Sequence, residues 1–316
     1  MARPDGKRAT YIDPVTQLMP YVMKKTYDAQ NYAKLEVDSA PIEAFIAEQS
    51  AKGEEYSFND VILASIVRLY SMREELNRFI VGKKIYDRYS MTVAFVIKKG
   101  LKELGAETIV KIDFDGSESI KDVSRKLKEV ILANNKDTGL NKLDLLMDKL
   151  TRCPTWIMSA AVGFLMGLDK HGLMPKKVVE ASPFHTSCFI TFLKSIKCDY
   201  IYHHIYDFGT VGMFFAIGKE KMTAKATAEG DVHAGKGFTI GITMDERYMD
   251  GLYMANTLRM WSSLLAHPQE LLKPGKKTYT KELVLERIKT KNKEKKARLA
   301  ELRKQIKEEK KKKNKK

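Results

Sequence analysis

Hydrophobic and polar positions follow two different periods in the first part of the chain. Residues 31–40 alternate between polar and apolar side chains, as a half-buried strand does. Residues 41–53 begin with a proline and end with a glycine, which predicts a helix. A second helix is predicted from Ser57 onward, because Ser57 and Asp60 have capping-box spacing and the apolar residues after them recur at helical intervals. This part of the chain therefore predicts a strand followed by two helices.

Strands are predicted again in the middle of the chain. They cover residues 79–88, with a turn at Gly82 and Lys83, residues 91–100 and residues 107–116. Residues 117–136 then have the period of an amphipathic helix. Its apolar face consists of Ile120, Val123, Leu127, Val130 and Ile131.

Helices are predicted to continue through residues 143–150 and through the longest apolar run, residues 155–168. That run has about 14 residues, whereas a membrane-spanning helix needs about 20. It predicts a buried core helix and no membrane span.

Strand patterns return after residue 182. They cover residues 187–196, 211–221 and 235–245, and a helix over residues 252–265 follows the last strand directly. No repeat of 20 to 50 residues is present, which argues against solenoids and propellers. The order of elements predicts a mixed α/β fold, a two-layer α+β sandwich in which helices cover a central sheet.

Charge divides the chain into three parts. Apolar residues make up 44% of the sequence, enough for a packed core, and the net charge is +16. Residues 276–316 carry 19 Lys and Arg against 6 Asp and Glu, a net +13 that leaves only +3 for residues 1–275. We expect an arm over residues 1–19, a catalytic-type domain over residues 20–275 and a basic tail over residues 276–316.

The basic tail is predicted to be solvated and partly helical. Leu299, Leu302 and Ile306 recur at helical spacing within it. Binding of this tail to RNA, anionic lipid or an acidic partner is a hypothesis, and no aromatic residues are interleaved with the lysines to stack on bases.

Several classes of protein are disfavoured by missing patterns. No secretion signal begins the chain, and Cys153, Cys188 and Cys198 form no CxxC pair. We therefore expect a cytoplasmic protein without a metal site, in which each thiol is a small buried hydrophobe. No GxGxxG, GxxxxGK[ST] or HExxH motif is present, which disfavours a nucleotide enzyme and a zinc protease.

One junction concentrates charged residues between an apolar strand and a helix. The stretch "DERYMDG", residues 245–251, follows the strand directly. An acidic side chain at a helix start satisfies backbone N–H groups, which accounts for Asp250. Capping leaves Glu246 and Arg247 unexplained.

This junction and its surroundings resemble a known family of enzymes. The strands "FITFLKSI" and "MFFAIGK", the motif "DERYMDG" and the helix "LYMANTLRMWSSLLAHPQELL" follow one another in order and spacing over about 85 residues. Together they resemble the catalytic domain of the 2-oxo acid dehydrogenase dihydrolipoamide acyltransferases, relatives of chloramphenicol acetyltransferase. A looser resemblance extends over residues 20–273. No lipoyl-bearing segment precedes it, so we expect a free-standing domain of the catalytic type.

The resemblance implies a homotrimer with an active site between subunits. In the family a thiol of coenzyme A or dihydrolipoamide enters that site, and acyl-CoA is the expected substrate here. The histidine of the family motif "DHRxxDG" is the general base, and Glu246 stands in its place. The family aspartate, here Asp250, pairs with a basic residue near the start of the domain, for which Lys24 and Lys25 are candidates. Arg247 and Gly251 belong to the same structural turn.

A hydroxyl on the "FITF" strand is implied as a donor to the oxyanion of the tetrahedral intermediate. The alignment places it at Thr191, and a shifted register would place it at Ser187.

Three interpretations of Glu246 remain open. A carboxylate is a weaker base than imidazole by about two pKa units, although burial raises a carboxyl pKa and can restore base strength. In the first interpretation Glu246 is such a base and the protein is an acyltransferase. In the second, a histidine replaces it, with His203 and His204, or His185, as candidates. In the third, the trimer is catalytically silent, binds acyl-CoA or a partner, and Glu246 is paired with Arg247 or a neighbouring cation.

Overall fold

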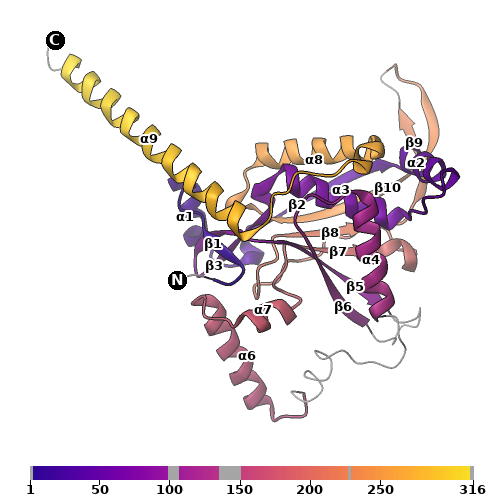
Figure 1. Cartoon of the computed structure of the whole chain (residues 1–316), viewed down its shortest axis with the longest axis horizontal. Helices are drawn as coiled ribbons and strands as arrows, with labels where there is room; N and C mark the ends of the chain where they lie inside the picture. Colours follow the sequence, from indigo (N-terminus) through magenta and orange to yellow (C-terminus); the bar gives the residue numbers. More distant parts are fainter. Residues whose placement is uncertain (1–2, 99–106, 135–150, 227–228, 314–316) are drawn as a thin grey trace.

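A mixed sheet forms the centre of the molecule. The computed structural model describes residues 3–98, 107–134, 151–226 and 229–313 (Figure 1). The strands of the main sheet are β2 (Gln30–Asp38), β5 (Met91–Lys98), β6 (Glu107–Phe114), β7 (Cys188–Phe192), β8 (Met213–Ile217), β9 (Lys221–Ala226) and β10 (Val232–Asp245). Their order is β2, β10, β8, β7, β5 and β6, and β9 pairs with β10. β7 runs parallel to both of its neighbours and the other pairs are antiparallel, so the predicted mixed sheet is confirmed.

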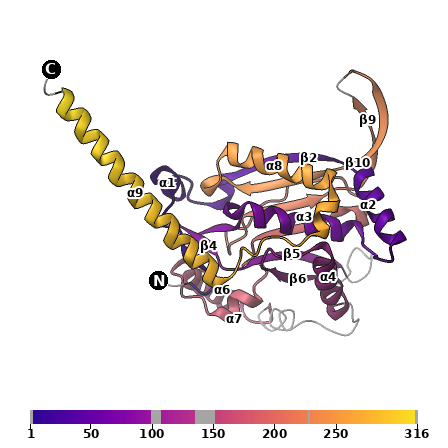
Figure 2. The same cartoon turned by 45° about the horizontal axis from the view of Figure 1, so that its top comes forward.

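Helices cover one face of this sheet, as Figures 1 and 2 show. They are α2 (Ala40–Ala51), α3 (Phe58–Met72), α4 (Ile120–Asn134) and α8 (Gly251–Ala266). α3 begins where the capping box predicted it: the Ser57 hydroxyl accepts a hydrogen bond from the backbone N–H of Asp60, and the Asp60 carboxylate accepts one from the backbone N–H of Ser57. The predicted two-layer arrangement of helices on a sheet is present.

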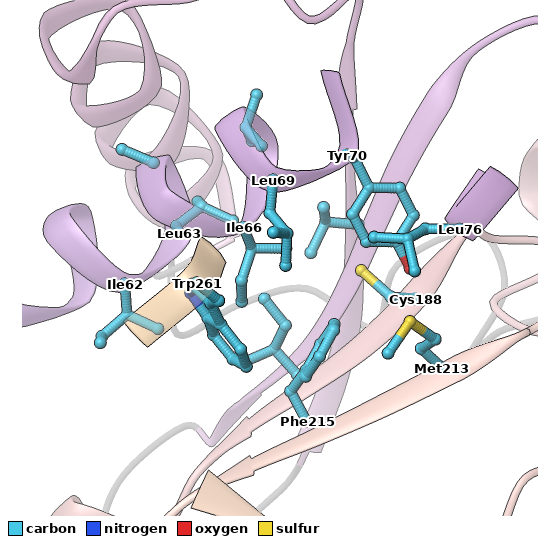
Figure 3. Packing of buried hydrophobic residues seen from close by; sticks show 14 of the residues in the cluster. Ile62, Leu63, Ile66, Leu69, Tyr70, Leu76, Cys188, Met213, Phe215 and Trp261 are labelled. Carbon is cyan, nitrogen blue, oxygen red and sulfur yellow. The ribbon is translucent and has the colours of Figure 1, made fainter. Parts of the chain in front are cut away.

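Trp261 on α8 lies at the centre of the core between the helices and the sheet. Its ring is fully buried, and its centroid lies 5.1 Å from that of Phe215 on β8 in an edge-to-face arrangement (Figure 3). Its indole N–H donates a 2.8 Å hydrogen bond to the Ser65 hydroxyl on α3, so the polar atom of this large side chain is satisfied. The hydrogen bond between Trp261 and Ser65 joins α3 to α8 over the strands that lead into the 245–251 junction.

The segment predicted as an N-terminal arm is packed into the fold. A second, three-stranded sheet contains β1 (Gly6–Arg8), β4 (Lys84–Arg88) and β3 (Arg78–Val81) in that order. Ala9 and Ile12 belong to the main core, and α1 (Pro14–Val22) follows them. The boundary expected after residue 19 therefore falls within a helix. The sequence did not indicate this packing, because the segment packs through one short strand and two buried apolar side chains. These are too few to produce an apolar period.

The prediction of a buried helix over residues 155–168 is wrong. These residues lie in α6 (Thr155–Lys170), which is followed by α7 (Lys176–Ala181). Trp156 is 72% exposed and Phe164 is 66% exposed, and Asp169 is the one buried residue of α6. The helix extends away from the main sheet (Figure 1), and the residues that the structure describes leave most of its surface exposed. The helix predicted over residues 143–150 lies outside the described residues.

The basic tail is one long helix, α9 (Lys281–Lys313), which projects from the body (Figures 1 and 2). Its first turns are docked, because Val284 and Ile288 are buried and Glu74 forms ion pairs with Arg287, at 2.8 Å, and with Lys291. Glu74 belongs to η2 (Glu74–Asn77), a short 3-10 helix before β3. No helix among the described residues is both long and apolar enough to cross a membrane.

Candidate functional site

The charged junction divides into a buried ion pair, a helix cap and a carboxylate that faces a pocket. β10 ends at Asp245 and is followed by the 3-10 helix η4 (Glu246–Tyr248). The Arg247 guanidinium donates to both carboxylate oxygens of Asp245, at 2.8 and 2.6 Å, and both side chains are buried. A third hydrogen bond from Arg247 reaches the Thr26 hydroxyl at 3.2 Å. This bidentate pair fixes the turn that carries Glu246.

Asp250 is the N-cap of α8. Its carboxylate accepts a 2.7 Å hydrogen bond from the backbone N–H of Tyr253, and the helix begins at Gly251. The predicted pairing of Asp250 with Lys24 or Lys25 is wrong for the described chain, in which the Lys25 ammonium instead lies 3.3 Å from Asp207. Asp250 lies on the exposed outer side of the junction, and the buried ion pair of the turn is made by the neighbouring Asp245 and Arg247.

Glu246 is half-buried between these two anchored residues. Its carboxylate accepts a hydrogen bond from the side-chain amide of Asn31, at the start of β2. The sheet register explains the contact, because Asn31 pairs with Met244, two residues before Glu246. The expectation that Glu246 pairs with Arg247 is wrong, since Arg247 is committed to Asp245. Within the described chain, the partner of Glu246 is an amide and not a cation.

A pocket of about 600 Å³ opens beside Glu246. α1 supplies one wall, and the start of β2, the end of β10 and the start of α8 supply the others. The lining is rich in methionine, with Met19, Met23, Met244, Met249 and Met254. The polar residues of the lining are Glu246, Asn31, Thr16, Tyr32, Arg247 and Asp250. We call this the methionine pocket; flexible thioether side chains allow such a wall to adapt to the shape of a ligand.

Thr191 does not meet Glu246 within one chain. It is half-buried on β7, where the register places it beside Ala216 of β8, which in turn pairs with Gly241 of β10. From Thr191 to Glu246 the path crosses two strand spacings and then runs five residues along the chain. Together these correspond to a distance of about 20 Å. The alternative residue, Ser187, is buried, and its hydroxyl accepts a 2.9 Å hydrogen bond from the backbone N–H of Thr92.

The candidate histidines are not in the wall of the methionine pocket. The ring of His203 stacks on Phe214 with the centroids 3.9 Å apart, and burial lowers its pKa below the usual range. His204 is exposed, and its ring lies 4.6 Å from that of His203. These contacts place the pair against the sheet face opposite the helices.

His185 lies in a different, polar environment. Its ring is buried, with Nδ1 2.8 Å from the Ser182 hydroxyl and Nε2 3.3 Å from the Asp169 carboxylate at the end of α6. The Asp169 carboxylate also accepts a 2.9 Å hydrogen bond from Arg3. These contacts tie the N-terminal segment and α6 to the residues that precede β7.

The thiols are in three different environments. Cys188 is buried on β7, and burial raises its pKa to about 12. Cys153 is half-buried, and Cys198 is exposed, so the expectation of a buried thiol is wrong for Cys198. Among the described residues, no group of three or more His, Cys, Asp or Glu side chains is placed to hold a metal ion.

Solved structures with a similar fold include acetyltransferases. A probable dihydrolipoamide acetyltransferase from Listeria monocytogenes 4b F2365 has a TM-score of 0.51 and 11% identity, over 82% of this chain and 89% of that chain. The dihydrolipoamide acetyltransferase of Azotobacter vinelandii has a TM-score of 0.49 and 13% identity, over 83% of this chain and 93% of that chain. A chloramphenicol acetyltransferase has a TM-score of 0.49 and 12% identity, over 82% of this chain and 99% of that chain. No family model and no curated protein sequence matches the chain.

The chain has the fold of the dihydrolipoamide acyltransferases. The Listeria structure shows this fold, because it is similar over most of both chains. At 11% identity the likeness concerns the fold, and the chemistry has to be argued from the site itself. The predicted fold class is confirmed.

The sequence did not predict two parts of this site. The alternating pattern places Asn31 on a strand but indicates no role for it, because its contact with Glu246 depends on the pairing of β2 with β10. No local pattern marks Met19 and Met23 as pocket residues, because their place in the wall depends on how α1 packs against η4.

Proposed function

We propose that this chain is an acyltransferase that moves a short acyl group between a coenzyme A-type thioester and a second acceptor, with Glu246 as its general base. The observation that carries the proposal is the position of the Glu246 carboxylate in the methionine pocket. A largely apolar pocket with a few placed polar groups is typical of a small-molecule site. The fold of the similar acetyltransferases supports the class of reaction by analogy.

In the proposed step, the Glu246 carboxylate takes the proton of the acceptor thiol or hydroxyl. The freed lone pair attacks the carbonyl carbon of the thioester and forms a tetrahedral intermediate. The C–S bond then breaks, the acyl group stays on the acceptor, and the Glu246 carboxyl returns the proton to the coenzyme A thiolate. Asn31 holds the carboxylate in position, and the Asp245–Arg247 pair keeps the supporting turn rigid.

We propose that the complete site forms between two copies of the chain in a homotrimer. Thr191 and Glu246 are about 20 Å apart in one chain, so a Thr191 hydroxyl that stabilises the oxyanion beside Glu246 must come from a neighbour. The exposed apolar side chains of α6 support assembly, because a helix that is apolar on most of its surface is usually covered.

Coenzyme A release tests the proposal. We would incubate the full chain with acetyl-CoA and a panel of thiol, hydroxyl and amine acceptors and follow free thiol. Turnover that falls by at least about a hundredfold in Glu246→Gln supports the base. Glu246→His, which installs a stronger base, should retain turnover, and Glu48→Gln, at an exposed glutamate on α2, is the matched control.

The alternative function is a catalytically silent trimer that binds acyl-CoA or acts as a scaffold. Saturable binding of acetyl-CoA without turnover in the wild type, Glu246→His and the control would favour this alternative. Equal turnover in the wild type and Glu246→Gln would remove the base role from Glu246.

A further inference from the structure

A second pocket, of about 440 Å³, has a strongly basic rim. It lies between the end of α1, the turn from β3 to β4, the end of α6 and the loop over residues 206–212. Four lysines line it: Lys24, Lys25, Lys83 and Lys170. We call this the lysine pocket. Its volume is in the range of small-molecule sites.

Every carboxylate that lines the lysine pocket is already neutralised by a cation. Asp169 is bound by Arg3 at 2.9 Å, and Asp245 is bound by Arg247 at 2.6 Å. The Asp207 carboxylate lies 3.3 Å from the Lys25 ammonium. The remaining lysines of the rim are Lys24, Lys83 and Lys170. None of these three has an ion-pair partner in the part of the chain that the structure describes. The Lys83 ammonium lies 5.3 Å from the centre of the Tyr21 ring, a cation–π contact that does not neutralise its charge. The pocket therefore has an excess of positive charge that no carboxylate neutralises.

The floor of the lysine pocket adds hydrogen-bonding groups without partners. Thr210 and Tyr248 line it, are 3% and 2% exposed, and have hydroxyls with no hydrogen-bond partner in the described chain. Burial raises the pKa of Tyr248 well above its usual range, so its hydroxyl remains a donor. A buried polar group without a partner lowers the stability of the fold unless a ligand or water satisfies it. This observation is independent of the lysines and also indicates a polar ligand.

We propose that the lysine pocket binds a small molecule that carries two or more phosphate-type negative charges. The Lys24, Lys83 and Lys170 ammonium groups supply point charges to the phosphate oxygens. The Thr210 and Tyr248 hydroxyls donate from the floor. The same chemistry would accept inorganic pyrophosphate or the phosphates of a nucleotide.

The lysine pocket is distinct from the methionine pocket. α1 separates them, because Pro20 lines the lysine pocket and Met19 and Met23 line the methionine pocket. Arg247 lies in the wall of both. Phosphate binding therefore does not depend on acyl transfer at Glu246, and the two proposals can fail separately.

Calorimetric titration of the full chain with inorganic pyrophosphate tests the proposal. We expect saturable binding that weakens by at least about tenfold in the double variant Lys83→Met, Lys170→Met. Lys84→Met, at the next residue along the chain, where β4 begins, is the matched control and should bind as the wild type does. Equal weakening in the control, or no saturable binding in the wild type, would overturn the proposal.

A second variant tests the floor without disturbing the fold. Tyr248→Phe removes only a hydroxyl that has no internal partner, so the urea midpoint should stay the same or rise while pyrophosphate affinity falls severalfold. Unchanged affinity would exclude the hydroxyl from the site. Titrations with ADP, coenzyme A and citrate distinguish nucleotide phosphates and carboxylates from pyrophosphate. Glu246→Gln should bind pyrophosphate as the wild type does, whatever its turnover.

Discussion

The side-chain amide of Asn31 donates a hydrogen bond to the carboxylate of Glu246 across the edge of the sheet. The two residues lie 215 positions apart in the sequence, and the antiparallel pairing of β2 with β10 brings them together. Asn31 therefore connects the edge strand of the sheet to the residue that we propose as the base. The amide is a neutral partner and does not neutralise the charge of the carboxylate. A carboxylate that keeps its negative charge can accept a proton.

Replacing Asn31 should reduce turnover without unfolding the protein. In Asn31→Ala the Glu246 carboxylate loses its positioning partner, and we expect kcat to fall by about tenfold. Because Asn31 is exposed, the free energy of unfolding should change by about 0.5 kcal/mol or less. Lys34→Ala, farther along the same strand, is the control. A kcat equal to that of the wild type would show that Asn31 does not position Glu246.

Breaking the Asp245–Arg247 pair should destabilise the domain. Arg247→Met leaves the buried Asp245 carboxylate without a counter-ion, and we expect a loss of about 3–5 kcal/mol in the free energy of unfolding. Urea denaturation measures it. The double variant Asp245→Asn, Arg247→Met removes both charges and should recover part of the loss. A single variant as stable as the wild type would contradict the structural role of this pair.

The docking of α9 should depend on pH through Glu74. Burial opposes ionisation of Glu74, but the hydrogen bond from Lys291 and the charge of Arg287 outweigh it and lower the pKa of Glu74 below its ordinary value of 4.5. A carboxyl with a lowered folded pKa stabilises the fold fully above its unfolded pKa, and this contribution is lost as the pH falls through the folded pKa.

The wild type should therefore be more stable than Glu74→Gln at pH 7, and the difference should shrink below about pH 4.5. Urea midpoints of both proteins across this range measure the difference. A difference that stays constant down to about pH 3 would show that ionised Glu74 does not hold α9.

The projecting half of α9 is the part of the tail that can bind a polyanion. Truncation after Lys296 keeps the buried Val284 and Ile288 but removes ten Lys and Arg and three acidic residues. If the tail binds polyanions, the truncated chain should elute from heparin at lower salt than the full chain. Unchanged elution would assign the polyanion affinity to the body of the protein.

The sequence predicted elements whose signals are local. The capping box at Ser57 and Asp60 marked the start of α3, because both partners lie within one turn. Three residues of the predicted face of α4 are buried, namely Ile120, Val123 and Leu127. The fold class followed from the same periodicities, because strand and helix patterns extend over many residues and average out local exceptions.

Features that depend on long-range packing could not be predicted. The apolar run of α6 predicts a core helix, but apolar content alone does not tell whether the covering layer belongs to the same chain. The resemblance predicts that Asp250 pairs with Lys24 or Lys25, whereas in the structure Asp250 caps α8 and the buried pair of the turn is Asp245 with Arg247. Only the packing of η4 against α1 decides which carboxylate points inward.

In the proposed trimer, Glu246 of one copy and Thr191 of another form one acyltransferase site. Mixing two inactive variants tests whether the site is shared between copies. We would co-refold Glu246→Gln with Thr191→Ala and measure coenzyme A release beside each variant alone.

Each single variant should be slow, with a loss of about a hundredfold or more. Random mixing in a cyclic assembly restores both wild-type residues in about a quarter of the sites, so the mixture should regain a corresponding share of wild-type turnover. A mixture no faster than the average of the two variants would contradict a site shared between copies.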